Sequence, residues 1–158
     1  LSGLPRAINA LTLLRDCTPA SLRQQCAAGG TKRPPVASWA DYVAEQQRGK
    51  AYWDRVYTKS STRVAGQLES AYPDLWTYTL QHVYAPLLSY TDVLSADETA
   101  LVVVASLVPQ DVNPQLKGHL RGAVNGGVAV ERVRAARDMA IEVGGWCGAV
   151  WRGPVAQV

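Results

Sequence analysis

The chain contains no phenylalanine, a single methionine, two histidines and three cysteines among its 158 residues. Cys17, Cys26 and Cys147 are far apart, their number is odd, and no Cys-x-x-Cys motif is present. This usage argues against a disulfide scaffold and against a zinc site, because only His82 and His119 are available to help bind a metal. We therefore expect no metal, no bound cofactor, and reduced, mostly buried thiols in an intracellular compartment.

Long hydrophobic runs are also absent. The apolar run Ala100–Val108 is too short to span a bilayer, and no secretory signal is visible. The net charge is only +3, and the modest basic cluster at Arg132, Arg134 and Arg137 is not interleaved with aromatic residues. We therefore expect neither a membrane span nor nucleic-acid binding. The sequence begins with Leu1 rather than methionine, which indicates a processed or trimmed start.

A helical period runs through most of the chain. Apolar residues recur every three or four positions, as at Leu4, Ile8, Leu11 and Leu14, which is the spacing of one helix face. The pattern predicts an all-α, compact bundle of about six to eight helices in one domain. We expect an N-terminal helical arm over residues 1–50, a core over 51–145 and a tail over 146–158. The clearest predicted helices are Ser61–Tyr72, Leu75–Ser89, Thr99–Val108, Gln115–Val124 and Val128–Val143.

Caps and helix breakers give some of these helices defined ends. The segment Ser95–Glu98 has the pattern of a capping box, and the apolar residues that follow it predict a central helix. Pro86 lies late in its helix and is expected to kink or close it. The pair Gly144-Gly145 is expected to end the last helix, and the tail beyond it, with Trp146 and Trp151, is predicted to dock on a neighbour or fold back.

The most informative segment is Gly118–Ala123, which reads Gly-His-Leu-Arg-Gly-Ala. Gly118 and Gly122 lie four residues apart, so they share one helix face, and each costs about 1 kcal/mol relative to alanine. Glycines placed in this way allow another helix or a ligand to approach the backbone closely. His119 stands beside this open face, where its imidazole can act near neutral pH.

These residues resemble the signature of the carboxymuconolactone decarboxylase family. That signature has a helix with a histidine, an Ala-x-Asn-x-Gly turn, and a helix that opens with glutamate and an aliphatic residue. The similar segments here are Gln115–Val128 with Val130–Val133, then Leu94–Thr99, and, for the fungal-type branch, Tyr72–Leu75, His82–Tyr84 and Leu4–Leu11. The resemblance covers about Trp53 to Gly145.

The resemblance implies an all-α fold of the alkylhydroperoxidase D type that assembles into trimers or hexamers. It also implies two chemistries, which are decarboxylation of a lactone acid with the histidine as a proton shuttle, and a peroxidase reaction that needs a Cys-x-x-Cys pair. Counted back from His119, the two cysteine positions fall on Val112 and Gln115. Neither side chain forms a thiolate or a disulfide, so we expect a non-redox protein.

The resemblance and the residue chemistry together suggest a site around His119. The candidate catalytic residues are His119, Glu98 and His82, and the candidate substrate-binding residues are Arg121, Gly118 and Gly122. Each has a structural alternative. His119 can be packed in a subunit contact, Glu98 can simply close the capping box, His82 and Tyr84 can line the site or only pack, and Arg121 can bind a substrate carboxylate or form a surface ion pair.

The sequence does not decide between two functions, which belong to different classes. The first is an enzyme, such as a lyase, that acts on a small organic acid by acid–base chemistry. The second is a non-catalytic subunit that uses the fold for assembly, either with itself or with unlike protein subunits. We expect an intracellular location, with the mitochondrion or the peroxisome as the organelles to consider and the cytoplasm also open.

Overall fold

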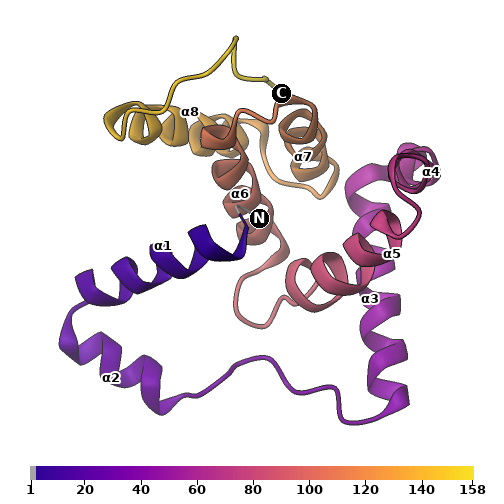
Figure 1. Ribbon diagram of the computed structural model, residues 1–158, viewed down its shortest axis with the longest axis horizontal. Helices are drawn as coiled ribbons and strands as arrows, with labels where there is room; N and C mark the ends of the chain where they lie inside the picture. Colours follow the sequence, from indigo (N-terminus) through magenta and orange to yellow (C-terminus); the bar gives the residue numbers. More distant parts are fainter. Residues whose placement is uncertain (1–2) are drawn as a thin grey trace. The chain divides into compact units, whose positions relative to one another are not determined.

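The computed structural model describes residues 3–158, apart from the side chains of Ala27 and Ala28, and divides the chain after Pro35 into two units (Figure 1). Leu1, whose position suggested a processed start, lies outside the described residues. All regular elements within residues 3–158 are helices. The predicted all-α class is therefore confirmed.

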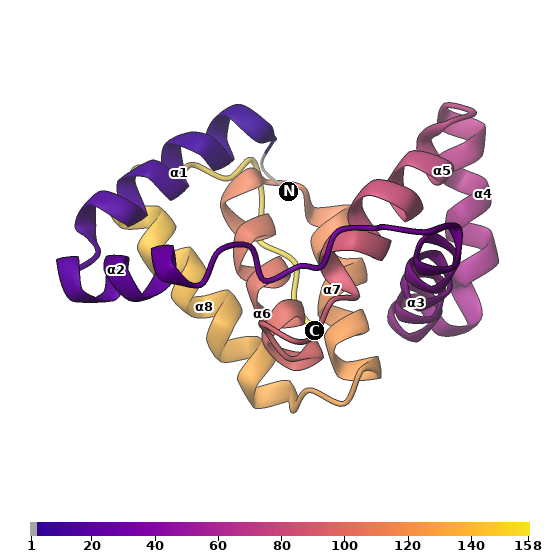
Figure 2. The same cartoon turned by 90° about the horizontal axis from the view of Figure 1, so that it is seen from below.

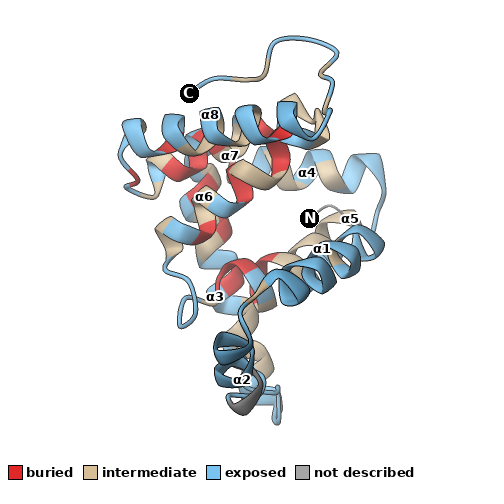
Figure 3. Cartoon of the chain, turned by 90° about the vertical axis from the view of Figure 1, so that its left-hand side faces the viewer, coloured by how far each residue is buried: buried red, intermediate tan, exposed pale blue. Residues whose placement is uncertain are grey.

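The first unit, which ends at Pro35, contains two helices. These are α1 (Leu4–Cys17) and α2 (Ala20–Ala28). Pro5 stands in the first turn of α1, where its missing N–H costs nothing, and the hydroxyl of Thr18 donates to the Leu14 carbonyl at the other end. No residue of α1 is buried, so its predicted apolar stripe faces solvent in this structure (Figure 3).

The second unit, Val36–Val158, contains the remaining helices. They are α3 (Trp39–Tyr57), α4 (Ser61–Ala71), α5 (Leu75–Thr79), the π-helix η2 (Leu80–Leu88), α6 (Ala96–Leu107), α7 (Asn113–Asn125) and α8 (Val130–Trp146), with the 3₁₀ turns η1 (Thr58–Ser60) and η3 (Val108–Gln110). Helix α6 lies between α7 and α8, and α3 packs along η2 (Figure 2).

The centre of the second unit is apolar. Val104 of α6, Leu120 of α7 and Val133 of α8 are fully buried against one another's helices. The predicted central helix therefore does lie in the core. One side of it remains open, however, because Val102 is 55% exposed. The side chain of Val102 is not buried within this unit, so this part of the α6 surface is available for contact with another molecule.

The predicted capping box begins α6. The Glu98 N–H donates to the Ser95 hydroxyl at 3.2 Å, and the Ser95 N–H donates to the Glu98 carboxylate at 2.8 Å. Two backbone N–H groups at the helix N-terminus therefore have partners that the helix itself cannot supply. The backbone N–H of Ser95 is the main reason that the pKa of Glu98 is lowered.

Replacing Ser95 by alanine is expected to lower the free energy of unfolding by about 1 kcal/mol, because a helix N-terminal N–H loses its acceptor. Urea unfolding followed by circular dichroism measures the loss. Glu98→Gln keeps an acceptor for the Ser95 N–H and should cost less. An equal loss in the two variants would contradict this assignment of the stabilisation to the cap.

Pro86, which was expected to kink or close its helix, lies inside a π-helix that ends two residues later, at Leu88. The chain from Leu80 to Leu88 is a π-helix, and the N–H of Ser89 donates to the carbonyl of Tyr84 five residues earlier at 2.9 Å. A wider turn accommodates the proline ring and its missing N–H. π-Helical turns are rare and are frequent at functional sites, so this segment draws attention to Tyr84.

Helix α8 includes the glycine pair that was expected to end it and stops one residue later, at Trp146. Gly144 is buried, and a side chain there would meet the Trp151 ring at 3.2 Å. The glycine therefore makes room for Trp151, whose indole N–H donates to the Val108 carbonyl at 2.7 Å. The guanidinium of Arg137 also donates to carbonyls of the tail, at Val155 and Ala156. The tail thus folds back on its own unit.

The cysteines are exposed, whereas buried thiols were expected. Cys17 and Cys26 belong to the helices of the first unit, where α1 has no buried residue, and Cys147 follows the last turn of α8. These positions offer no core in which a thiol can be covered. Within residues 3–158, none of the helices combines the length and the apolar character that crossing a membrane requires.

Candidate functional site

Three helices each contribute one polar aromatic side chain to a short hydrogen-bonded chain. The hydroxyl of Tyr57, from the end of α3, lies 3.2 Å from the hydroxyl of Tyr84 on η2. The Tyr84 hydroxyl lies 3.5 Å from Nε2 of His119 on α7. The second contact is long and therefore the weaker of the two, and the donor depends on the histidine tautomer. His119 thus has a partner that can give or take a proton.

Aromatic rings surround this chain. Trp53 is 1% exposed. Its ring centroid lies 4.1 Å from the ring centroid of Tyr57, 4.7 Å from that of Tyr84 and 4.6 Å from that of Trp76. We call Trp53, Tyr57, Trp76, Tyr84 and His119 the aromatic–histidine cluster. The spacing of Trp53 and Tyr57 by four residues places both on one face of α3.

Burial keeps the cluster uncharged. It lowers the pKa of His119 to about 4, because the imidazolium would lose much of its hydration. It raises the pKa values of Tyr57 and Tyr84 for the same reason. At neutral pH the three groups are therefore neutral donors and acceptors in a surrounding of low polarity, where hydrogen bonds to a developing charge are strong.

One further donor in the cluster lacks a partner. The indole N–H of Trp53 is buried and makes no hydrogen bond with any described residue. A buried N–H without an acceptor costs about 1–3 kcal/mol, so such groups usually meet water or a ligand. The indole N–H is therefore a second group, beside the tyrosine–histidine chain, that can bind an oxygen atom.

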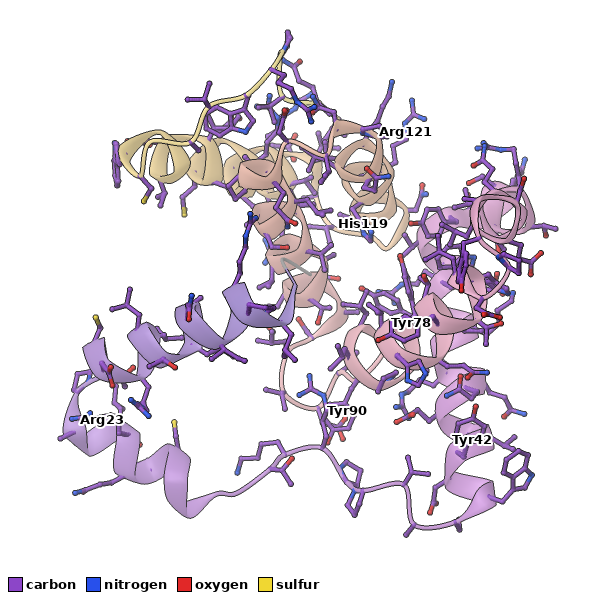
Figure 4. All side chains as sticks on the ribbon, in the orientation of Figure 1. Arg23, Tyr42, Tyr78, Tyr90, His119 and Arg121 are labelled. Atoms are coloured by element: carbon purple, nitrogen blue, oxygen red, sulfur yellow. The ribbon has the colours of Figure 1, made fainter. Side chains whose placement is uncertain are left out.

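The structure does not bring the other predicted catalytic residues, Glu98 and His82, or the predicted substrate-binding residue Arg121 to His119. Glu98 is exposed and engaged in the capping box at the start of α6. His82 is exposed and packs against Tyr78, with ring centroids 4.7 Å apart. Arg121 is exposed, and it leaves α7 in a different direction from His119 (Figure 4). A helix turns by about 200° between positions i and i+2, which explains this divergence.

The two glycines of α7 contact helix α3. A side chain at Gly122 would lie 2.5 Å from Cγ1 of Val56 and 3.3 Å from its carbonyl oxygen. One at Gly118 would meet only the Tyr57 ring, at 3.7 Å. The close approach predicted from the sequence is therefore made by a neighbouring helix, and it is what places Tyr57 beside His119.

We expect Gly122→Ala to lower the free energy of unfolding by about 1–3 kcal/mol, because the new methyl group overlaps Val56. In Gly118→Ala the new methyl group lies at an ordinary van der Waals distance from the Tyr57 ring. Because the substitution also replaces a glycine inside a helix, it should stabilise the protein by up to about 1 kcal/mol. Thermal unfolding of the two variants tests this. If both substitutions change the free energy of unfolding by the same amount, α3 does not lie closer to Gly122 than to Gly118.

Nothing in the sequence singled out Trp53 and Tyr57 as site residues. Their i, i+4 spacing was visible, but their partners come from helices far along the chain. Tyr84 is 35 residues from His119, and only the fold brings the two together. The π-turn that contains Tyr84 has no sequence signal of comparable clarity.

Comparison with known proteins gives a family. Residues 71–156 match the family model of the carboxymuconolactone decarboxylase family. A Saccharomyces cerevisiae relative named "Peroxisomal protein 2" is 46% identical over 174 aligned residues, and the alignment covers all of this chain but only 62% of the relative's length. A Schizosaccharomyces pombe relative of the same name is 38% identical over 155 residues, covering 98% of this chain and 68% of the relative. No solved structure matches. The chain belongs to the carboxymuconolactone decarboxylase family.

Proposed function

We propose that the chain carries out non-redox acid–base chemistry, decarboxylation or a related proton transfer, on a small organic acid bound at the aromatic–histidine cluster. The observation that carries this proposal is the chain of hydrogen bonds from Tyr57 through Tyr84 to His119. Family membership supports it. The peroxidase chemistry of related proteins is not proposed, because Val112 and Gln115 stand where the cysteine pair would be.

The cluster suits a decarboxylation. Loss of CO₂ leaves an electron pair on carbon, which spreads onto a conjugated carbonyl and makes an enolate. Neutral donors such as the Tyr84 hydroxyl and the Trp53 N–H stabilise the enolate oxygen in a dry site. His119, which is neutral before the step, takes the proton of the substrate's carboxylic acid as CO₂ leaves and gives it to carbon, so that it is neutral again afterwards, while the Tyr84 hydroxyl, with Tyr57 behind it, orients the imidazole. Glu98, His82 and Arg121 have no part in this scheme, because each is exposed.

We expect His119→Gln to lower turnover by about 10²-fold or more, because the proton-transferring group is lost. The measurement is CO₂ release from a carboxylated unsaturated lactone, the compound class in the family's name. His82→Gln is the matched control, since His82 is the other histidine and is exposed. Undiminished turnover of His119→Gln would remove His119 from the mechanism, and no turnover by the wild-type protein would remove the enzymatic function.

The second function, a subunit that serves assembly, is favoured by a different observation. Several large apolar side chains outside the core are exposed, among them Leu11 of α1 and Met139 and Trp146 of α8. Such surfaces mark sites of protein–protein contact. A stable complex with unlike chains, captured at native abundance, together with a wild-type protein that turns over no lactone acid, is the result expected for this function.

A peroxisomal location is proposed from the relatives, both of which carry "Peroxisomal protein 2" as their name. The mitochondrial alternative has no such support. The chain spans 62% of the Saccharomyces cerevisiae relative, so the full-length protein is the one to localise. We expect a fluorescent fusion of it to coincide with a peroxisomal marker, and a mitochondrial pattern would contradict the proposal.

A further inference from the structure

The helices that form the aromatic–histidine cluster are poor in charge. Residues 75–91, the span that contains α5 and η2, include no aspartate, glutamate, lysine or arginine. Helix α7 has two charged residues, Lys117 and Arg121, which are exposed and stand two positions before and two positions after His119 (Figure 4). Two residues correspond to about 200° of helix rotation, so both positions are turned away from that of the histidine.

Helix α3 has charged residues beside the cluster, but these are already engaged. Nζ of Lys50 lies 2.6 Å from the carboxylate of Asp54. The guanidinium of Arg55 lies 5.7 Å from the centroid of the Tyr52 ring, and a side chain at Gly126 would lie 3.5 Å from its Nε. Gly126 directly follows α7, so Arg55 stands at the C-terminus of that helix and is not directed at the imidazole.

The polar groups of the cluster therefore act without a charged neighbour. Within residues 3–158, no charged side chain contributes to the pKa shifts of His119, Tyr57 and Tyr84, which come from burial and from the tyrosines themselves. A carboxylate placed against these groups would lose its hydration and meet no cation, which is strongly unfavourable where the surroundings have low polarity. An uncharged carbonyl group loses much less, because neutral donors can bind its oxygen.

The cluster also offers flat apolar surfaces to a ligand. Trp53 and Tyr84 are buried, whereas Tyr57, Trp76 and His119 are half-buried, so part of the cluster reaches the surface of the unit. A conjugated ring can pack on such side chains in offset or edge-to-face arrangements. The unpaired indole N–H and the tyrosine–histidine chain supply the donors for a carbonyl oxygen. Shape and donors together suit a flat, conjugated carbonyl compound.

We propose that the aromatic–histidine cluster binds flat conjugated carbonyl compounds in uncharged form and discriminates against their carboxylate anions. This inference rests on the proposed function for the location of the site, and it specifies the substrate class. An acid on which the chain acts binds with its carboxyl group protonated, the form that holds the proton that His119 takes as CO₂ leaves. At pH 7 about one molecule in 10³ of an ordinary carboxylic acid is in this form, so the apparent affinity for the acid is lower by that factor.

The test compares two probes of the same size and shape, coumarin-3-carboxamide and coumarin-3-carboxylate, both of which are conjugated lactones. Isothermal titration calorimetry of the full chain at pH 7 gives the two dissociation constants. We expect the amide to bind about 10²-fold or more tightly than the carboxylate, because only the carboxylate has to be protonated or to lose its hydration. Equal affinities, tighter binding of the carboxylate, or no binding of the amide would overturn the proposal.

Nuclear magnetic resonance locates the bound amide. The chain has five tryptophans, and each gives one indole N–H signal. Trp53→Phe identifies the signal of Trp53, which should move when a ligand oxygen accepts its unpaired N–H. If the amide binds and leaves this signal in place, the ligand lies elsewhere and the proposal is wrong.

Introducing a cation should reverse the discrimination. Gln115 is exposed and lies four positions before His119, on the same face of α7. Gln115→Arg should raise the affinity for the carboxylate by about tenfold and leave that for the amide unchanged. Lys117→Gln is the matched control, because it removes an exposed charge turned away from His119, and it should change neither affinity. An equal change of the affinity ratio in both variants would contradict the role of local charge.

These binding results and the measurement of CO₂ release fail independently, because binding needs no turnover. A carboxylate that binds as tightly as the amide would remove the preference for uncharged ligands and leave His119 as the proton-transferring group. A wild-type protein without turnover would remove the enzymatic function, whereas the ratio of the two dissociation constants would still be measured.

Discussion

Replacing Gly49 by alanine should destabilise the protein by about 3 kcal/mol or more, the largest effect that we expect from any single methyl group. A side chain at Gly49 would lie 2.5 Å from Cα and 2.8 Å from the backbone nitrogen of Ala85. Backbone atoms cannot rotate away as the end of a long side chain does, so α3 and η2 must separate. Because Trp53 and Tyr84 meet across the same pair of helices, the separation also disturbs the cluster.

Gly66→Ala is the matched control for this variant. Gly66 lies inside α4, and a side chain there would meet nothing within 4 Å. The substitution should therefore stabilise the protein by up to about 1 kcal/mol through helix propensity. Urea unfolding of the two variants gives both free energies. Similar values for Gly49→Ala and Gly66→Ala would mean that α3 and η2 are further apart in solution than the structure has them.

Features that depend on neighbours in the sequence were predictable. The capping box at Ser95–Glu98 was expected and is present, because both of its hydrogen bonds form within four residues. The helix around His119 was expected for a similar reason, since Asn113-Pro114 begins it and Gly126-Gly127 follows it. The all-α class follows from many such local signals that agree with one another.

Features that depend on distant contacts were not predictable. The π-turn at Leu80–Leu88 forms where Ala85 packs against Gly49, and the sequence of the segment alone reads as an ordinary helix with a proline. The glycine pair does stand at the end of α8, but the sequence does not show that Gly144 makes room for Trp151. Tyr84 was named as a residue that can line the site, but its hydrogen bond to His119 and the part of Tyr57 and Trp53 were not predicted, because a single sequence does not say which helix faces which.

The folded protein should lose stability between pH 6.5 and pH 5 because of His119. Its pKa is about 4 in the folded protein and 6.5 for an ordinary histidine. Within that interval the unfolded chain holds up to one proton more than the folded chain, so the free energy of unfolding falls as the pH falls. The contribution is fully present above pH 6.5, and the loss on acidification to pH 4 is at most about 3 kcal/mol, less any screening at the exposed part of the ring.

Above pH 5, the pH dependence of the unfolding free energy reports on His119 and not on the carboxylates. The pKa values of Asp54, Glu98 and Asp111 are lowered in the folded protein, so the stability that they contribute is lost only below their ordinary values near 4. His119→Gln should reduce the pH dependence of the unfolding free energy between pH 7 and pH 5. His82→Gln, which changes an exposed histidine, should keep the pH dependence of the wild type. Urea unfolding at pH 7, 6 and 5 compares the three proteins. If His119→Gln retains the wild-type slope, the imidazole is hydrated in solution, and the dry, neutral environment on which the proposed proton transfer depends is absent.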